Sequence, residues 1–322
     1  MRDAGLGAGE QTPGDTAVIL GTGGGGESSR EEAAVRLFAE RKLRCNPGLV
    51  PKTNNQASVG FVTMEFGFTG PSLVVSTGCA AATHAMAQAF LMVKHGLARR
   101  AITGGSEAAV ILGVVQAFDA ARILSHTTCR PFSRERDGMV IGEGGGAVIL
   151  ETLDDARARG AYIYAELAGV GMSADATSSV HPQEQGPAQA IAMALAQAGM
   201  NPGEVDYINA HGTGTQVNDR VESQAIRRVF GVHADRLTVS STKSLHGHTF
   251  GAAGAIELVA TLLAMKHQVA PPTANYLGPD DGCDLDYAPN TPKERRIDVA
   301  LKESFAFGGL NAVLALRKNI AL

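Results

Sequence analysis

The residue that most directly suggests chemistry is Cys79, which stands where a short apolar run passes through Ser-Thr-Gly into an alanine-rich segment. From this stretch alone, the cysteine is either a small buried side chain or a nucleophile. A helix start offers unpaired N–H groups and the positive end of the helix dipole, and both favour a thiolate. If Cys79 is a nucleophile, we therefore expect its pKa to lie below the usual value of about 8.5. The same N–H groups would stabilise an oxyanion that forms beside the sulfur.

Two histidine-bearing segments are the next candidates. His211 follows a strand-like run in NAHGTGTQVND, where glycines let a ligand approach the imidazole. The segment STKSLHGHTFGAAGAIE carries Lys243, His246 and His248 within six residues, and Glu257 follows on the next helical stretch. Two histidines at i and i+2 make a metal site one alternative. No carboxylate or cysteine stands at ligand spacing, so we expect no metal. We expect His246 to be a loop residue.

Other polar or reactive side chains are expected to be structural. His84 lies on the helix that follows the cysteine, where a polar residue usually makes a local hydrogen bond. Asp219 and Glu222 either orient the preceding histidine turn or cap the next helix, and their spacing of three favours a capping box. Cys129 and Cys283 are interpreted as buried structural cysteines.

A glycine pattern near the N-terminus resembles a dinucleotide-binding turn. Gly21, Gly23 and Gly26 form GxGxxG directly after the run TAVILG. A nucleotide site also needs a second strand that ends in an acidic residue about 20 positions on. Residues 28–51 contain neither, so we interpret the segment as a glycine turn and expect no bound cofactor.

Composition excludes several classes of protein. The chain has 322 residues, a net charge of −4 and no dense basic stripe, since RKLR at 41–44 is short and isolated, so nucleic acid is not an expected partner. The chain has no run of about 18 uncharged apolar residues, so we expect no membrane span. The N-terminus lacks the apolar core of a secretory signal. Cys45, Cys79, Cys129 and Cys283 are far apart, which argues against a disulfide framework and predicts a cytoplasmic location.

The elements that must position these residues alternate along the chain. Short runs rich in Val, Ile and Leu predict strands buried on both faces, and alanine-rich stretches between them predict helices, which together indicate a layered α/β fold. A strand leads through a loop into a long helix in both parts of the chain, which suggests two related halves, 1–158 and 159–322. The predicted strands are 16–21, 72–77, 100–105, 146–151, 206–211, 237–242, 298–304 and 309–318, and the predicted helices are 79–96, 186–200, 219–231 and 251–268.

Five motifs in order resemble one known family. GCAAATHA, PFSRERDGMVIGEGGGAVILE, NAHGTGTQVND, STKSLHGHTFGAAGAIE and ESFAFGGLNA are similar, in this order, to motifs of the β-ketoacyl-acyl-carrier-protein synthases. The resemblance runs over essentially the whole chain and implies the thiolase-like αβαβα fold of two pseudo-duplicated halves. Family members begin with a further strand that we expect to be central to its half. Because this chain starts at Met1 in what resembles the end of a helix, we expect the first half to be incomplete at its start.

The resemblance also assigns roles. Cys79 would be the acylated nucleophile, and His211 and His248 would flank it and support decarboxylation of the extender unit. The backbone N–H groups of the cysteine and of a gating phenylalanine would form the oxyanion hole. The supporting residues that match the family are a lysine that orders the site electrostatically, a buried acid and that phenylalanine: Lys243, Glu257 and Phe307.

The implied activity is decarboxylative Claisen condensation of malonyl-acyl-carrier protein with an acyl chain held on Cys79, in fatty-acid or polyketide elongation. Expected partners are acyl and malonyl forms of acyl carrier protein, and a second subunit in a homodimer or a ketosynthase heterodimer. The alternative is a non-catalytic or truncated partner subunit, against which the presence of Cys79 argues. A thiolase would need a second catalytic cysteine near the C-terminus, and FAFGGLNAV has none.

Overall fold

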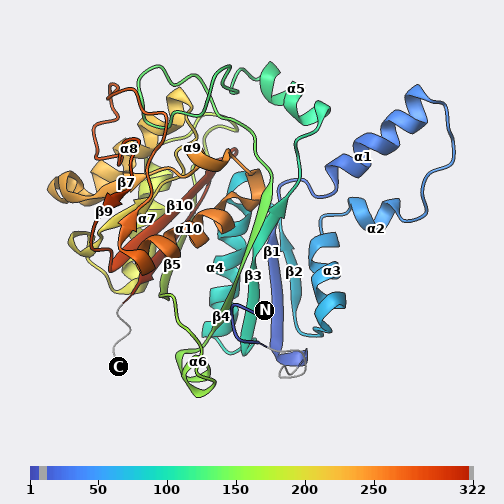
Figure 1. Cartoon of the computed structure of the whole chain (residues 1–322), viewed down its shortest axis with the longest axis horizontal. Helices are drawn as coiled ribbons and strands as arrows, with labels where there is room; N and C mark the ends of the chain where they lie inside the picture. The colour runs from blue at the N-terminus through green and yellow to red at the C-terminus, as the bar shows by residue number, and fades with distance from the viewer. Residues whose placement is uncertain (7–12, 319–322) are drawn as a thin grey trace.

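Four strands form the first sheet of the structure, a computed structural model that describes residues 1–6 and 13–318 (Figure 1). Their order is β2-β1-β3-β4, with β1 parallel to both of its neighbours and β4 antiparallel to β3. β1 is buried along its whole length, as its uninterrupted apolar run predicts. The bounds are Thr16–Gly21 for β1, Ser72–Val75 for β2, Arg100–Glu107 for β3 and Gly144–Glu151 for β4.

A five-stranded sheet follows, in the order β5-β11-β10-β6-β7. β10 is antiparallel to β11 and parallel to β6, which is parallel to β7. The order and directions of β4-β3-β1-β2 are therefore repeated by β11-β10-β6-β7, so the related order of strands and helices seen in the sequence extends to the sheets. The bounds are Glu166–Ala174 for β5, Tyr207–Asn209 for β6, Thr238–Ser240 for β7, Val299–Ala306 for β10 and Leu310–Arg317 for β11.

One strand has no counterpart in this repeat. β5 pairs antiparallel with β11 at the edge of the second sheet, and no described strand occupies the matching place beside β4. In the second half the first strand therefore lies at an edge of its sheet, while the expectation for the first strand of the first half stays a prediction. The boundary between residues 158 and 159 stays a prediction; the described strands of the two sheets span 16–151 and 166–317.

Two helices lie between the sheets. Ala85 and Ala89 of α4 (Ala81–Lys94) pack on the first sheet, whereas Ala82 and Met86 face a core shared with the second sheet and α10. Alanine at these positions lets both sheets approach the helix closely. α10 (Ala253–His267) belongs to the segment 250–267, which is apolar and long enough to cross a membrane by composition alone; 61% of it is buried inside the molecule, as expected of a central helix.

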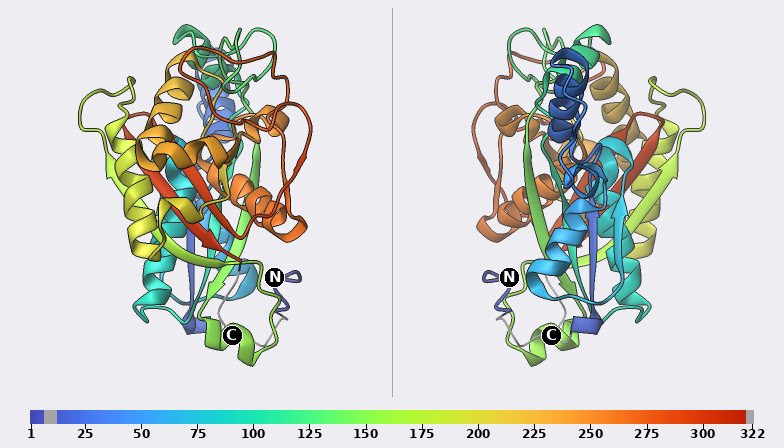
Figure 2. Two further views of the ribbon diagram at one scale, coloured as in Figure 1. Left: turned by 90° about the vertical axis from the view of Figure 1, so that its left-hand side faces the viewer. Right: turned by 90° about the vertical axis from the view of Figure 1, so that its right-hand side faces the viewer.

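Further helices cover the outer faces of both sheets. α3 (Ala57–Phe66) packs on the first sheet through Val59, and α7 (Gln185–Ala198) and α8 (Gln216–Phe230) cover the second (Figure 2). The αβαβα layering that the family resemblance implied is thereby confirmed.

Several elements were not predicted from the sequence. β5 was missed because ELAGVGMSA is rich in glycine, and the structure explains why: a Cβ on Gly171 would lie 1.9 Å from the carbonyl oxygen of Ala190 in α7.

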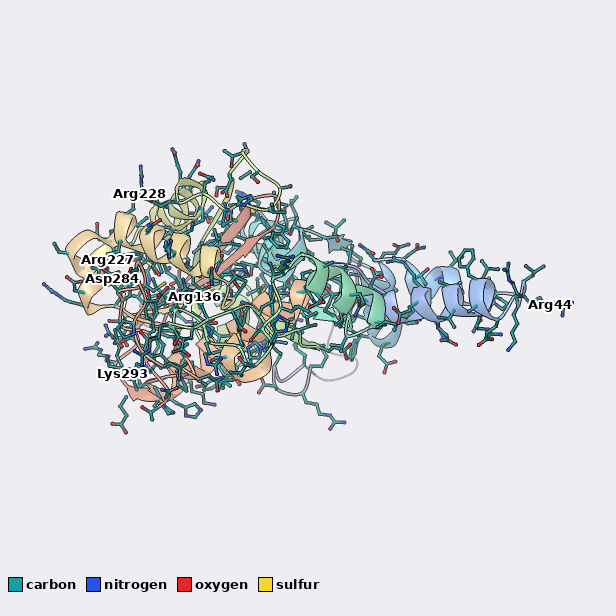
Figure 3. All side chains as sticks on the ribbon, turned by 90° about the horizontal axis from the view of Figure 1, so that it is seen from above. Arg44, Arg136, Arg227, Arg228, Asp284 and Lys293 are labelled. Carbon is teal, nitrogen blue, oxygen red and sulfur yellow. The ribbon has the colours of Figure 1, made fainter. Side chains whose placement is uncertain are left out.

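The segment that carries α1 projects from the body, with Arg44 at its tip, far from Arg227 and Arg228 (Figure 3). The remaining helices and strands are α1 (Glu27–Ala34), α2 (Leu49–Thr53), α5 (Leu112–Ala120), α6 (Leu153–Ala158), α9 (Lys243–His246), β8 (Val269–Ala270) and β9 (Lys293–Glu294).

Candidate active site

Cys79 lies in a single 3-10 turn, Gly78–Ala80, that joins β2 to α4. Gly78 has φ +56°, a left-handed conformation that glycine adopts without strain, and a Cβ there would lie 3.6 Å from the Cβ of Ala306. The end of β10 therefore lies against the cysteine turn. His84 makes the predicted local hydrogen bond, with its Nδ1 2.9 Å from the Thr77 hydroxyl.

The resting state of the cysteine differs from the expected thiolate. Burial raises the pKa of Cys79 to about 11, and the nearby Lys243 ammonium lowers it by less. The prediction of a depressed pKa is therefore wrong. The physical reason is that α4 begins at Ala81, two residues later, while the cysteine packs in an apolar group with Met139 and Phe250.

His211 and His248 are both buried, with ring centroids 5.4 Å apart and planes at 83°. The Nδ1 atom of His248 accepts a hydrogen bond from the backbone N–H of Phe250 at 3.2 Å, so the proton of the neutral ring is on Nε2. That Nε2 atom is buried and has no hydrogen-bond partner among the described residues. The Nδ1 atom of His211 lies 3.4 Å from the Lys243 ammonium, which likewise assigns the proton of that ring to Nε2.

Both imidazoles are held neutral. Burial lowers the pKa of His211 and of His248 well below the ordinary value, and the positive charge of Lys243 lowers both further. Two neutral rings that each present an Nε2–H group can donate hydrogen bonds without first taking up a proton. Such donors suit an oxygen on which negative charge develops.

The first half of the chain positions His248. The backbone N–H of His248 donates to the carbonyl oxygen of Val140 at 2.7 Å, and the N–H of Gly142 donates to the carbonyl oxygen of His248 at 2.9 Å. The ring of His248 stacks on Phe250, which belongs to the apolar cluster against which Cys79 packs. The structure therefore brings the predicted cysteine and the two predicted histidines to one place, where the two halves meet.

A buried charge network lies behind the histidines. Lys243 is fully buried, donates to the carbonyl oxygen of His211 at 2.6 Å and pairs closely with the carboxylate of Glu257. The other carboxylate oxygen of Glu257 lies 2.8 Å from the ammonium of Lys302, also fully buried. Sequence reasoning missed Lys302, although a lysine within the apolar strand VALKESFA was a usable signal.

Asp219 and Glu222 do not form the predicted capping box, because α8 begins earlier, at Gln216. The carboxylate of Glu222 instead accepts hydrogen bonds from the backbone N–H groups of His211 at 2.6 Å and Gly212 at 2.8 Å. Asp219 accepts from the N–H of Gly214 at 3.2 Å and from that of Phe132 at 2.7 Å. These acids therefore hold the histidine turn, which was the alternative interpretation.

The glycine turn after β1 is occupied by a side chain of the chain itself. The carboxylate of Glu107, at the end of β3, accepts hydrogen bonds from the backbone N–H groups of Gly23 and Gly24 and from that of Gly251 at 3.1 Å. Where a dinucleotide turn would bind phosphate, an internal carboxylate is already bound. No group of three or more His, Cys, Asp or Glu side chains within residues 1–6 and 13–318 is placed to hold a metal ion.

The remaining predicted side chains lie at the edges of the site. Phe307 stands in the turn between β10 and β11 and is 51% exposed. Gly308 and Gly309 follow it with φ of +83° and +67°, so the turn depends on glycine. His246 ends the short helix α9 rather than lying in a loop, with its Nε2 3.2 Å from the Thr242 hydroxyl.

We expect Glu303→Gln to stabilise the protein increasingly as the pH rises from 5 to 8, by about 1–3 kcal/mol at pH 8. Neither carboxyl oxygen of Glu303 has an N–H or hydroxyl donor among the described residues, and the carboxyl faces that of Glu222. Burial and this neighbour raise the pKa of Glu303 well above 4.5, so folding holds a proton that the unfolded chain releases as the pH rises. Urea unfolding at several pH values measures the difference. Glu294→Gln, at an exposed position, is the control, and a pH-independent difference for Glu303→Gln would contradict the assignment.

Comparison with known proteins identifies the class. Residues 1–156 match the family described as "Beta-ketoacyl synthase, N-terminal domain", and residues 164–277 match "Beta-ketoacyl synthase, C-terminal domain". The chain belongs to the β-ketoacyl synthase family. The resemblance found in the sequence and the thiolase-like fold class are therefore confirmed.

Individual relatives cover nearly all of this chain. It is 47% identical over 318 residues to "Nodulation protein E" of a Rhizobium species, which covers 99% of this chain and 79% of the relative. It is 42% identical over 327 residues to "3-oxoacyl-[acyl-carrier-protein] synthase 2" of a Synechocystis species, covering 99% and 78%. Two solved structures have a TM-score of 0.95, each covering 99% of this chain. They are "The ishigamide ketosynthase/chain length factor", at 33% identity and 79% of that chain, and a "type II PKS acyl-carrier protein in complex with its ketosynthase", at 35% and 82%.

Proposed function

We propose that this chain catalyses decarboxylative Claisen condensation of a malonyl thioester with an acyl chain held on Cys79, in fatty-acid or polyketide elongation. One observation carries the proposal: the buried Nε2–H group of His248 has no hydrogen-bond partner in the described part of the chain and lies beside a second neutral imidazole, that of His211. A buried donor left unpaired is costly in a folded protein unless a ligand uses it. An enolate oxygen is a ligand that two such donors would stabilise.

The first step is transfer of the acyl group. The sulfur of Cys79 attacks the carbonyl carbon of an acyl-carrier-protein thioester, a new S–C bond forms and the carrier thiol leaves with the proton that the cysteine loses. The chemistry is balanced, because one thioester replaces another. The backbone N–H groups of Cys79 and Phe307 are proposed to hold the oxyanion of this step.

The second step forms the carbon–carbon bond. The malonyl thioester loses carbon dioxide, and the electron pair of the broken bond gives an enolate whose oxygen accepts hydrogen bonds from His211 and His248. The enolate carbon then attacks the acyl-cysteine carbonyl, and the sulfur of Cys79 leaves and regains a proton. Lys243 and Glu257 are proposed to keep both imidazoles neutral and in place, and Phe307 to gate the site.

Partners are proposed on the same basis. Acyl carrier protein is the proposed donor of both substrates, since it is named in one structure similar to this one. A second subunit is proposed to bind at β2, the terminal strand of the first sheet among the described residues. Leu73 on this strand and Phe61 and Met64 on the adjacent α3 are exposed, and an open strand edge beside apolar side chains favours pairing.

The free cysteines and the burial of the apolar segment 250–267 support a cytoplasmic location.

The test supplies the purified chain with acyl- and malonyl-acyl-carrier protein and measures carbon dioxide and 3-oxoacyl product. We expect equal amounts of both. His248→Ala is expected to lower carbon dioxide release about 10²–10³-fold, as for loss of one oxyanion donor. His246→Ala, two residues away with its own partners, should retain most of the rate.

Three results would argue against the proposal. Equal losses in the two histidine variants would remove the assigned role of His248. If the chain alone forms no product but does so when mixed with a ketosynthase subunit whose own cysteine is intact, the chain is instead the partner subunit. Absence of product both alone and in the mixture would reject condensation.

A further inference from the structure

We propose that Lys302 is a second positioning lysine of this site. It holds the carboxylate of Glu257 in place and connects α4, the helix that follows Cys79, to β10, the strand that leads to Phe307. The inference rests on the proposed function, since it assigns Lys302 an effect on the condensation chemistry. Lys302 itself contacts no reacting atom in this assignment. It acts through Glu257 and through the two imidazoles.

The ammonium group of Lys302 has two hydrogen-bond acceptors and one ion-pair partner. It donates to the hydroxyl oxygen of Ser304 at 2.9 Å and to the backbone carbonyl oxygen of Glu303, and it forms the 2.8 Å ion pair with Glu257. A lysine ammonium carries three N–H donors, and these hydrogen bonds use two of them. The side chain is fully buried, as is that of Glu257. The two hydrogen bonds and the ion pair therefore hold the buried ammonium group between β10 and α10.

The contact with Ser304 extends the network to the nucleophile helix. The hydroxyl of Ser304 lies 2.8 Å from that of Thr83, which is in the first turn of α4, four residues after Cys79. A Cβ on Gly254 of α10 would lie 2.1 Å from the Thr83 hydroxyl oxygen, so α10 approaches α4 closely at this point. Lys302 therefore links three elements: β10, α10 with Glu257, and α4 beneath the cysteine.

The charge balance explains why a second lysine matters. Two buried ammonium groups, those of Lys243 and Lys302, share one carboxylate, so the network carries one excess positive charge beside His211 and His248. Such a charge disfavours protonation of the imidazoles. The charged and titratable groups around Lys302 are Glu257 of α10, Lys243 of α9, Glu222 of α8 and Glu303 of β10, together with both imidazoles, while α4 contributes the Thr83 hydroxyl.

The test compares Lys302→Met with Ser304→Ala. Lys302→Met leaves Lys243 and Glu257 as a neutral pair, whereas Ser304→Ala keeps both ammonium charges and removes the link to Thr83. We expect the acid limb of the pH–rate profile for malonyl decarboxylation to move up by about one pH unit in Lys302→Met and to stay in place in Ser304→Ala. Histidine NMR titration of the same proteins should show the same upward shift for His211 and His248.

The NMR measurement separates two kinds of failure. If no variant decarboxylates malonyl thioesters but the imidazoles still titrate higher in Lys302→Met, the proposed function fails and the electrostatic role stands. If the imidazoles titrate as in the wild type, the role of Lys302 is overturned whatever the activity. Lys302→Gln, which keeps a donor toward Ser304 but no charge, should shift as Lys302→Met does and provides a second protein for the same measurement.

Discussion

Replacing Cys79 with alanine is expected to abolish covalent acylation of this chain by an acyl thioester and, with it, all condensation. A buried cysteine beside the histidine turn is the control: the thiol of Cys129 lies 3.6 Å from the carbonyl oxygen of Thr213, inside the fold. Intact-protein mass spectrometry after incubation with acyl-acyl-carrier protein reports the mass of the bound acyl group. We expect the adduct in the wild type and in Cys129→Ala and none in Cys79→Ala.

The pH dependence of the same cysteine tests its protonation state. Because burial raises the pKa of Cys79 to about 11, the resting sulfur is a thiol at neutral pH. The thiolate fraction then rises about tenfold per pH unit up to that pKa. The rate of alkylation of Cys79 by iodoacetamide should therefore rise about tenfold with each pH unit between pH 7 and 10. A rate that levels off near pH 7 would instead indicate a depressed pKa.

In the acylation experiment, an acyl adduct that persists in Cys79→Ala would remove the cysteine from the mechanism.

The sequence was informative where burial is uniform. The runs that became β1, β3, β10 and β11 are rich in apolar or small residues without regular alternation, and these strands are buried along most of their length because helices cover both of their faces. β5 was not predictable in this way, since its glycines admit α7 at close range and interrupt the apolar pattern. The pattern of apolar residues along a strand reflects which of its faces are covered. This pattern does not identify a strand where the covering helix packs so closely that only small residues fit.

The site was predictable as a set of motifs and less so as a network. Cys79, His211 and His248 were found because each stands in a short distinctive segment. Lys302 reaches Glu257 only through the pairing of β10 beside α10, a contact between residues 45 positions apart that no motif encodes. The protonated state of Cys79 was missed for a similar reason: the dipole of its own helix is a local property, whereas the apolar side chains that bury it come from other elements.

Replacing Glu257 with glutamine is expected to lower the free energy of unfolding by about 3–5 kcal/mol. The carboxylate is the shared counter-charge of Lys243 and Lys302, and all three side chains are fully buried. The variant keeps the shape of the side chain but leaves two ammonium groups without a negative partner. Burial lowers the pKa of Lys302, so its release of a proton relieves part of the cost and the loss should shrink as the pH rises. Urea unfolding at pH 7 and pH 9 measures both effects.

Removing one ammonium group at the same time distinguishes charge from shape. In Glu257→Gln combined with Lys302→Met, only Lys243 remains charged, so we expect the double variant to be more stable than Glu257→Gln alone. Glu65→Gln, on the exposed face of α3, should change stability by no more than about 0.5 kcal/mol and controls for the substitution itself. If the double variant were less stable than Glu257→Gln by the full cost of Lys302→Met, the two side chains would act independently. That result would contradict the assignment of this ion pair as an energetic link between α10 and β10.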